Sequence, residues 1–121
     1  MEFDASNLVI AGVTNTSRHN APDIVYAYPT ETTDLPEDFV APTGLQVSDV
    51  ILVGPLGNDG LVDMRRASAY ILTSPDRQPE PLPMATFRWV NKLGEYQPLA
   101  NLPAYHRGAV AQWQANKEVF L

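Results

Sequence analysis

Two histidines, His19 and His106, are the side chains of this sequence best suited to proton transfer or metal binding near neutral pH. Each lies beside an arginine, Arg18 or Arg107, and a neighbouring guanidinium disfavours both a charged imidazole and a bound cation. The sequence has no H-x-H, H-x₃-H or H-E-x-x-H spacing. We therefore expect ordinary surface histidines and no metal site.

Two acid pairs have the residue types for general acid–base catalysis, as in glycoside hydrolysis: Glu37 with Asp38, and Asp59 with Asp63. The first pair lies in a polar loop, where a run of solvated acids is the usual state. The second pair begins at a residue that a hairpin turn explains more simply. We also weighed a site assembled from His19, His106 and Asp63, which would need these distant residues to converge.

The stretch GNDG at residues 57–60 offers Asp and Asn oxygens of the kind that Ca²⁺ prefers. An EF-hand loop needs further ligands at alternate positions and a closing glutamate. Leu61 and Val62 stand where ligands would be required. The pattern predicts a turn and no calcium site.

Covalent catalysis and cofactor binding find no support in the sequence. There are no cysteines, which excludes disulfides, thiolate zinc sites and a cysteine nucleophile. There is no G-x-S-x-G motif and no P-loop. Ser17 lies near His19 along the chain, but this proximity does not aim one side chain at the other. We predict a protein that is not an enzyme and that uses no cofactor.

The elements that must position these residues are predicted to be strands. Eleven prolines are spread between residues 22 and 103, and proline breaks helix interiors. A turn at Asp59 and Gly60 predicts a hairpin, and residues 92–95 predict a second turn. Residues 65–69 fit one helical turn or a bulged strand. Runs rich in β-branched and aromatic residues predict strands at 7–13, 23–28, 45–53, 61–64, 69–73, 85–91 and 96–99.

Long proline-rich loops separate these strands. Residues 29–44 form an acidic loop that we expect Phe39 and Val40 to anchor, and residues 74–83 read as an extended, polyproline-like connection. Residues 108–121 alternate as a strand does, but their alanines also suit a short helix. We predict a single domain, 1–121, that is mainly β: a small antiparallel sandwich or barrel with long Pro-rich loops and a C-terminal strand or short helix.

Charge is unevenly distributed along the chain. The net charge is −6, but residues 1–64 carry ten acids and one base, whereas residues 65–121 carry four acids and seven bases. So acidic a half disfavours nucleic acid as a partner. No apolar stretch is long enough to span a membrane and no signal peptide is evident, so we expect a soluble product made in a cytoplasm. The asymmetry fits two halves that neutralise each other within one fold. It also fits a dipolar subunit that packs acidic face to basic face with copies of itself or with a partner.

These patterns favour a non-enzymatic structural or assembly subunit with other protein subunits as partners, in a homo- or hetero-oligomer. A virion component, such as a capsid-decorating, head-completion or tail protein, fits this description by analogy. The alternatives are a small β-barrel ligand-binding module, with a pocket lined by residues such as Trp89 and Tyr96, and a small enzyme with a site assembled from distant residues. Large aromatic side chains dominate interfaces, so the candidate interface residues are Phe3, Phe39, Trp89, Tyr105, Trp113 and Phe120.

Overall fold

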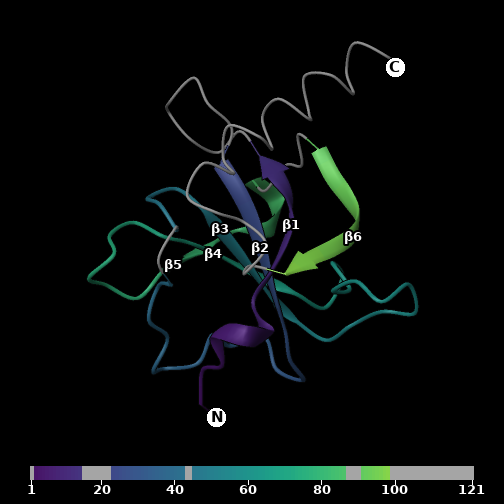
Figure 1. The fold of residues 1–121 in the computed structure, drawn as a ribbon, viewed down its shortest axis with the longest axis horizontal. Helices are drawn as coiled ribbons and strands as arrows, with labels where there is room; N and C mark the ends of the chain where they lie inside the picture. The colour runs from purple at the N-terminus through teal and green to yellow at the C-terminus, as the bar shows by residue number, and fades with distance from the viewer. Residues whose placement is uncertain (1, 15–22, 43–44, 87–90, 99–121) are drawn as a thin grey trace.

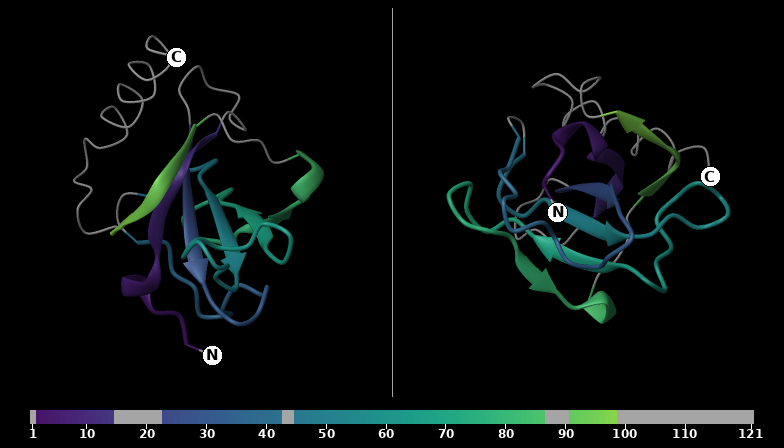
Figure 2. Two further views of the ribbon diagram at one scale, coloured as in Figure 1. Left: turned by 90° about the vertical axis from the view of Figure 1, so that its right-hand side faces the viewer. Right: turned by 90° about the horizontal axis from the view of Figure 1, so that it is seen from below.

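The computed structural model describes residues 2–14, 23–42, 45–86 and 91–98. Within these residues six strands form one open sheet, in the spatial order β5-β4-β3-β2-β1-β6 (Figures 1 and 2). Two single-turn 3₁₀ helices, η1 (Ala5–Asn7) and η2 (Met84–Thr86), flank it. The strands are β1 (Val9–Thr14), β2 (Asp23–Pro29), β3 (Val50–Gly54), β4 (Ser68–Ile71), β5 (Glu80–Leu82) and β6 (Asn91–Pro98). The prediction of a mainly β fold is confirmed.

The sheet is mixed and open, which corrects the predicted antiparallel sandwich or barrel. β2 and β3 run parallel, while the other neighbouring strands run antiparallel. The chain from residue 30 to residue 49 returns to the end of the sheet where β2 began, so β3 sets out in the same direction as β2. The two edge strands, β5 and β6, do not meet, so the described strands close no barrel.

The centre of the sheet is buried on both faces. Every residue of β3 and all of β2 except Pro29 are buried. Strands buried on both sides read as continuous apolar runs rather than alternating ones, which is the pattern of residues 23–28. Burial of one such Val, Leu or Ile side chain contributes about 1.5–3 kcal/mol to stability.

One face of this sheet, here called the aromatic face, carries large rings. Its buried side chains come from β1, β2 and β3, and they include Tyr26 and Tyr28. Residues 2–8, 30–42 and 45–49 cover this face and are called the acidic cover. Phe3 stacks on Tyr28, with 5.3 Å between ring centroids, and meets Phe39 edge-on at 4.7 Å. These rings fix the N-terminal segment and the 30–42 loop to the sheet.

The opposite face, here called the small-residue face, has no buried ring among its core side chains. These are Ala11, Val25, Ala27, Val50, Leu52, Val62 and Ala69. Residues 55–67, here called the 55–67 connection, lie over this face together with Leu82, Met84 and Tyr96. Tyr96 accepts a hydrogen bond at its hydroxyl from the backbone N–H of Val62. Burial raises the pKa of Tyr96 above its ordinary value, and the charge of Asp59 adds to the effect.

Asp49 is a fully buried carboxylate that ties the starts of the two parallel strands together. Its Oδ1 accepts from the backbone N–H of Ile24 at 3.1 Å, and its Oδ2 accepts from that of Gln46 at 2.9 Å. Leu72 N–H donates to the Asp49 carbonyl at 2.9 Å. A buried charge is tolerated where it is hydrogen-bonded in this way.

The predicted hairpin between residues 45–53 and 61–64 is wrong in its partner. β3 begins only at Val50, because residues 46–49 form a turn in which Ser48 has a φ of 80°. The strand that pairs with β3 is β4, whereas residues 61–64 make a single bridge, Leu56 with Val62. Residues 65–69, left open between two conformations, divide into a turn after Asp63 and the start of β4.

Two further predictions are corrected at the sheet edges. Residues 74–83 do not form only an extended connection, since residues 80–82 pair with β4 as β5. Residues 92–95 do not reverse the chain. Residues 91–98 form one strand, β6, whose register against β1 jumps so that residues 93–96 lie opposite Ala11. A strand glycine such as Gly94 marks a bulge as readily as a turn.

One of the two predicted anchors of the 29–44 loop is confirmed and the other is wrong. Phe39 is buried in the core of the aromatic face, but Val40 is 71% exposed. The predicted strand at 108–121 and most of that at 85–91 lie outside the described residues. No helix in the described ranges is long and apolar enough to cross a bilayer.

Candidate functional site

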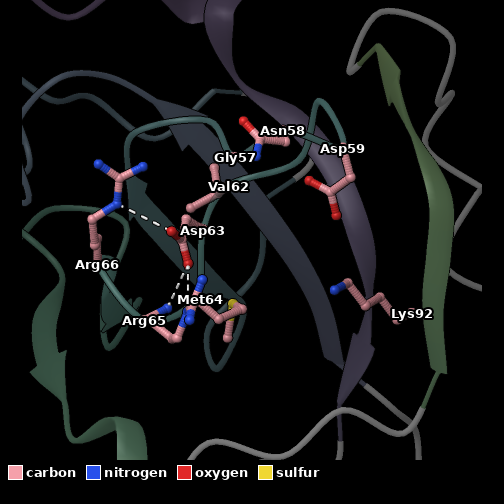
Figure 3. A pocket seen from close by; sticks show the side chains of 9 residues that line it. All are labelled: Gly57, Asn58, Asp59, Val62, Asp63, Met64, Arg65, Arg66 and Lys92. Carbon is pink, nitrogen blue, oxygen red and sulfur yellow. Dashed lines mark hydrogen bonds and ion pairs between the residues drawn. The ribbon is translucent and has the colours of Figure 1, made fainter.

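The 55–67 connection and β6 line a surface hollow with a volume of about 460 Å³, here called the arginine hollow. Cationic and anionic side chains share its wall, with Lys92 facing the connection from β6 across the hollow (Figure 3). The lining residues are Gly57, Asn58, Asp59, Val62, Asp63, Met64, Arg65, Arg66 and Lys92.

A tight turn at residues 57–61 shapes the upper wall of the arginine hollow. Gly57 N–H donates to the Leu61 carbonyl, and Asp59 Oδ1 accepts from the Leu61 N–H at 3.0 Å. Gly60 has a φ of 80°, which only glycine adopts without strain. Asp59 is therefore a turn residue, as the sequence indicated, and its carboxylate is committed to the backbone.

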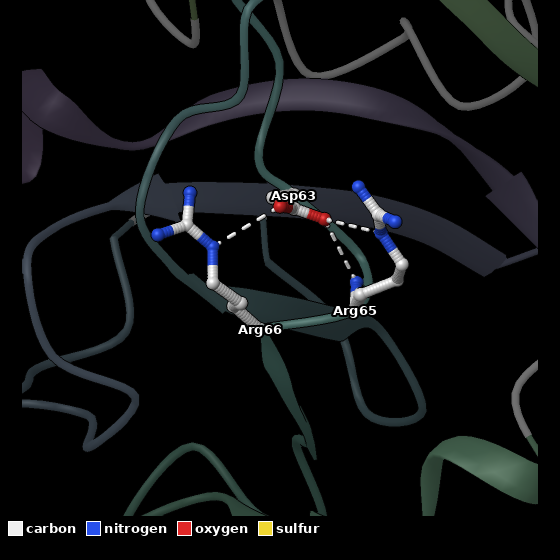
Figure 4. A network of polar contacts seen from close by, with 3 residues as sticks. All are labelled: Asp63, Arg65 and Arg66. Carbon is white, nitrogen blue, oxygen red and sulfur yellow. Dashed lines mark hydrogen bonds and ion pairs between the residues drawn. The ribbon is translucent and has the colours of Figure 1, made fainter.

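Asp63 organises the lower wall. Its Oδ1 accepts from the Arg65 backbone N–H at 3.0 Å and lies 3.6 Å from Arg65 Nε, while its Oδ2 accepts from Arg66 Nε at 3.1 Å (Figure 4). The Arg65 N–H is the main cause of a lowered pKa for Asp63, and the Arg66 guanidinium adds to it. The side chain thus stays ionised and holds both arginines at one turn.

The arginine side chains are the accessible polar groups of the hollow. The Arg65 side chain is 92% exposed and that of Arg66 is 59% exposed. Only their Nε atoms bond to Asp63 in these contacts, so the terminal nitrogens face outward and suit a carboxylate or phosphate group of a partner. The lining contains no Ser, Thr, Cys or His side chain. The described residues contain no cluster of three or more side chains that would hold a metal ion.

Two other hollows are shallow surface features. One of about 490 Å³ lies between the end of β2 and the start of the 55–67 connection, and its lining includes Glu31 and Leu56. Another of about 290 Å³ lies on β4 and β5, between Tyr70 and Met84. Two of the three volumes reach the ~300 Å³ of small-molecule sites. Tyr96, expected to line a ligand pocket, instead packs on the small-residue face.

The acidic cover carries acidic side chains and no basic ones: its three segments contain no Lys, Arg or His. Asp38 accepts from the Phe3 N–H with both oxygens, at 2.8 and 3.0 Å, so one carboxylate of the predicted acid pair is structural. Val40 and Val47 add exposed apolar surface, 71% and 47% exposed. The exposed acids are Glu2, Asp4, Glu31, Asp34, Glu37 and Asp38.

The predicted interface residues separate into two groups. Phe3 and Phe39 lie together, but their rings point inward from the acidic cover to the core: Phe39 is buried and Phe3 is partly buried. Asp63, the third residue of the site considered with the two histidines, lies in the arginine hollow. The other candidates, His19, Trp89, Tyr105, His106, Trp113 and Phe120, lie outside the described residues.

Sequence reasoning missed the arginine hollow and the exposed valines. The adjacent pair Arg65 and Arg66, two residues after Asp63, was the available signal for the hollow. The charge imbalance of the first half was recognised, but its concentration on one cover of one sheet face required the fold.

Comparison with known proteins gives no relative for this chain: no family model, no curated protein and no solved structure matches it. Its function must therefore be inferred from its own residues.

Proposed function

We propose that this chain is a non-enzymatic structural subunit of a larger protein assembly and that it docks through its acidic cover. The observation that carries the proposal is the composition of this cover. Six exposed carboxylates and two exposed valines occupy it without a single cationic side chain. Such a surface suits a basic partner surface that has an apolar centre.

The construction of the cover supports this role. Irregular chain and one single-turn 3₁₀ helix, η1, lie over the aromatic face, and aromatic rings packed on the core hold them in place. The Tyr70 hydroxyl donates to the Thr33 carbonyl at 2.9 Å, and Gln78 Nε2 donates to the Phe39 carbonyl at 2.7 Å. These bonds present the acids on a fixed surface, which lowers the entropy lost on docking.

More specifically, we propose a virion component: a capsid-decorating, head-completion or tail protein. It is supported by analogy alone, since a small β-rich subunit with long ordered loops suits such assemblies. The arginine hollow, on the opposite side of the sheet, gives each subunit an accessible pair of guanidinium groups. Copies or partners that stack acidic cover to arginine hollow would form an open, head-to-tail series.

The test compares the mass of the full chain by light scattering with that of a variant carrying Glu31→Gln, Asp34→Asn and Glu37→Gln. These three acids are exposed and accept no hydrogen bond described above. We expect a multimer whose mass falls as salt is raised, because salt screens exposed charges, and we expect the triple variant to remain smaller at low salt.

The matched control neutralises three exposed acids outside the cover: Asp76→Asn, Glu80→Gln and Glu95→Gln. It should assemble as the parent chain does. If the partner is a different protein, the chain should co-sediment with it at fixed stoichiometry from its native source, and the triple variant should not. A chain that sizes as a monomer at all salt concentrations and sediments alone from its source would refute the proposal.

A further inference from the structure

β5 forms one edge of the sheet and pairs antiparallel with β4 on its inner side. The register sets Leu82 opposite Ala69, Pro81 opposite Tyr70 and Glu80 opposite Ile71. Proline has no backbone N–H, so Pro81 cannot exchange the two hydrogen bonds of a bonded pair with Tyr70. This pair must be the non-hydrogen-bonded kind.

The direction of every backbone group in β5 follows from that pair. Bonded and non-bonded pairs alternate along an antiparallel ladder, so Glu80 and Leu82 turn their N–H and C=O groups toward β4. Pro81 turns its carbonyl and its nitrogen outward, away from the sheet. Pro79 and Pro83 directly flank the three residues of β5, so the residue beyond each end of the strand also lacks a backbone N–H. At Pro81, the outward-facing position of β5, the chain has no N–H group to offer.

We propose that these alternate prolines make β5 a terminating edge, at which neither a second copy of this chain nor an extended segment of a partner can be added to the sheet. A strand that adds to an edge needs both donors and acceptors from it, and this edge supplies acceptors alone. The exposed Glu80 adds a charge that opposes pairing with its own copy. Subunits that assemble therefore do not do so by continuing the sheet across β5.

The experiment restores outward donors with Pro81→Thr and Pro83→Thr in the full chain, both at exposed positions. Two copies of the variant can then pair their β5 strands antiparallel about a two-fold axis. Sedimentation equilibrium at high salt, where docking through the acidic cover is screened, should show a dimerisation constant raised about tenfold or more over the parent chain. The new amides at positions 81 and 83 should exchange hydrogen slowly in the dimer and fast in the monomer.

The matched control carries Pro75→Thr and Glu80→Thr. It also removes one exposed proline and adds threonine to β5, and it removes the charge of Glu80, but it creates no outward N–H in the strand. We expect it to sediment as the parent chain does. Equal dimerisation of both variants would assign the effect to lost charge or rigidity and overturn the proposal. So would a folded Pro81→Thr, Pro83→Thr variant, with a parent-like circular dichroism spectrum, that dimerises no more than the parent. Neither result bears on docking through the acidic cover, which the charge variants test separately.

Discussion

The aromatic face and the small-residue face belong to the same strands, yet they are covered in different ways. On the aromatic face, Tyr26, Tyr28 and Phe39 fill the space between the sheet and its cover. On the small-residue face, alanines and valines leave little side chain to fill that space. A covering segment there has to approach the strands closely with its backbone.

Gly54 shows how close that approach is. A Cβ placed on Gly54 would lie 2.9 Å from the Ala67 Cα and 3.2 Å from the Arg66 carbonyl oxygen. The two covers nevertheless share one device, a tyrosine hydroxyl that accepts a backbone N–H of the cover: Tyr28 accepts from Asp4 at 3.0 Å, and Tyr96 accepts from Val62. The size of the side chains on each sheet face thus sets the distance between the sheet and the segment that covers it. A hydrogen bond to a tyrosine hydroxyl fixes one point of that segment.

The largest effect is expected on the aromatic face. Phe39→Ala should lower the free energy of unfolding by about 3–5 kcal/mol, because it removes a buried ring and leaves a cavity between cover and sheet. Urea unfolding followed by circular dichroism measures the change. The neighbouring variant Val40→Ala, at a site 71% exposed, should stay within about 0.5 kcal/mol of the parent chain. Similar losses in both variants would contradict the placement of Phe39.

A smaller loss is expected from crowding the small-residue face. Gly54→Ala should lower the free energy of unfolding by about 1–3 kcal/mol, since the added methyl meets backbone that cannot move aside freely. Gly94→Ala is the control, because a Cβ at Gly94 would meet nothing within 4 Å. Thermal unfolding of the two variants makes the comparison. A harmless Gly54→Ala would show that the 55–67 connection does not sit tightly on the sheet.

The tyrosine hydroxyls allow each cover to be loosened separately. Tyr96→Phe and Tyr28→Phe should each lower the free energy of unfolding by about 1 kcal/mol, because one backbone N–H loses its acceptor. Amide hydrogen exchange tells the two effects apart: exchange should accelerate at Val62 only in the first variant and at Asp4 only in the second. Acceleration at both amides in either variant would mean that the covers open together.

The smallest effect is expected from acid. The pKa of Asp4 is lowered, first by the Ser6 hydroxyl and then by the Ser6 N–H, and that of Asp63 is lowered mainly by the Arg65 N–H. A carboxyl whose pKa is lower in the folded state stabilises the fold above its ordinary value of 3.8, and this contribution is lost as pH falls through the folded pKa.

Stability should therefore decline as the pH drops below about 4, and Asp4→Asn and Asp63→Asn should each make that decline shallower. Because each acid belongs to a different cover, the double variant should flatten the profile by the sum of the two single effects. Thermal unfolding across this pH range measures all three. A double variant that declines as steeply as the parent would place the acid sensitivity elsewhere.

Local sequence predicted the parts of the fold that depend on local preference. The runs at 7–13, 23–28 and 69–73 correspond to β1, β2 and β4, and the turn at Gly60 forms where glycine allows it. Phe39 was correctly identified as an anchor of its loop. A run rich in β-branched and aromatic residues favours a strand before its partner is known, so these predictions could be made from the local sequence.

The predictions that failed depended on distant residues. The turn at Gly60 predicts that β3 pairs with residues 61–64. In the structure β3 instead pairs with every residue of β4, and residues 61–64 form one bridge, between Val62 and Leu56. The four prolines of residues 74–83 predict an extended, polyproline-like connection. The structure forms β5 there because a strand with prolines at alternate positions is tolerated at the edge of a sheet. The arginine hollow likewise depends on β6, which brings Lys92 opposite a turn some thirty positions earlier in the sequence.

Asp49 has a consequence for how the molecule folds. β2 and β3 are parallel, so they can pair only after residues 30–49 have closed as a loop, and the described parts of that segment, 30–42 and 45–49, hold no helix that would shorten the search. The Asp49 carboxylate gains the Ile24 N–H and leaves water in that same event, whereas its other donor, the Gln46 N–H, belongs to the local turn at residues 46–49. Loop closure and burial of the carboxylate thus occur in the same step. We therefore expect a folding time on the order of milliseconds to seconds, which is typical of folds dominated by contacts between distant residues. Until that barrier is crossed, the apolar runs of the central strands are open to pairing with other chains.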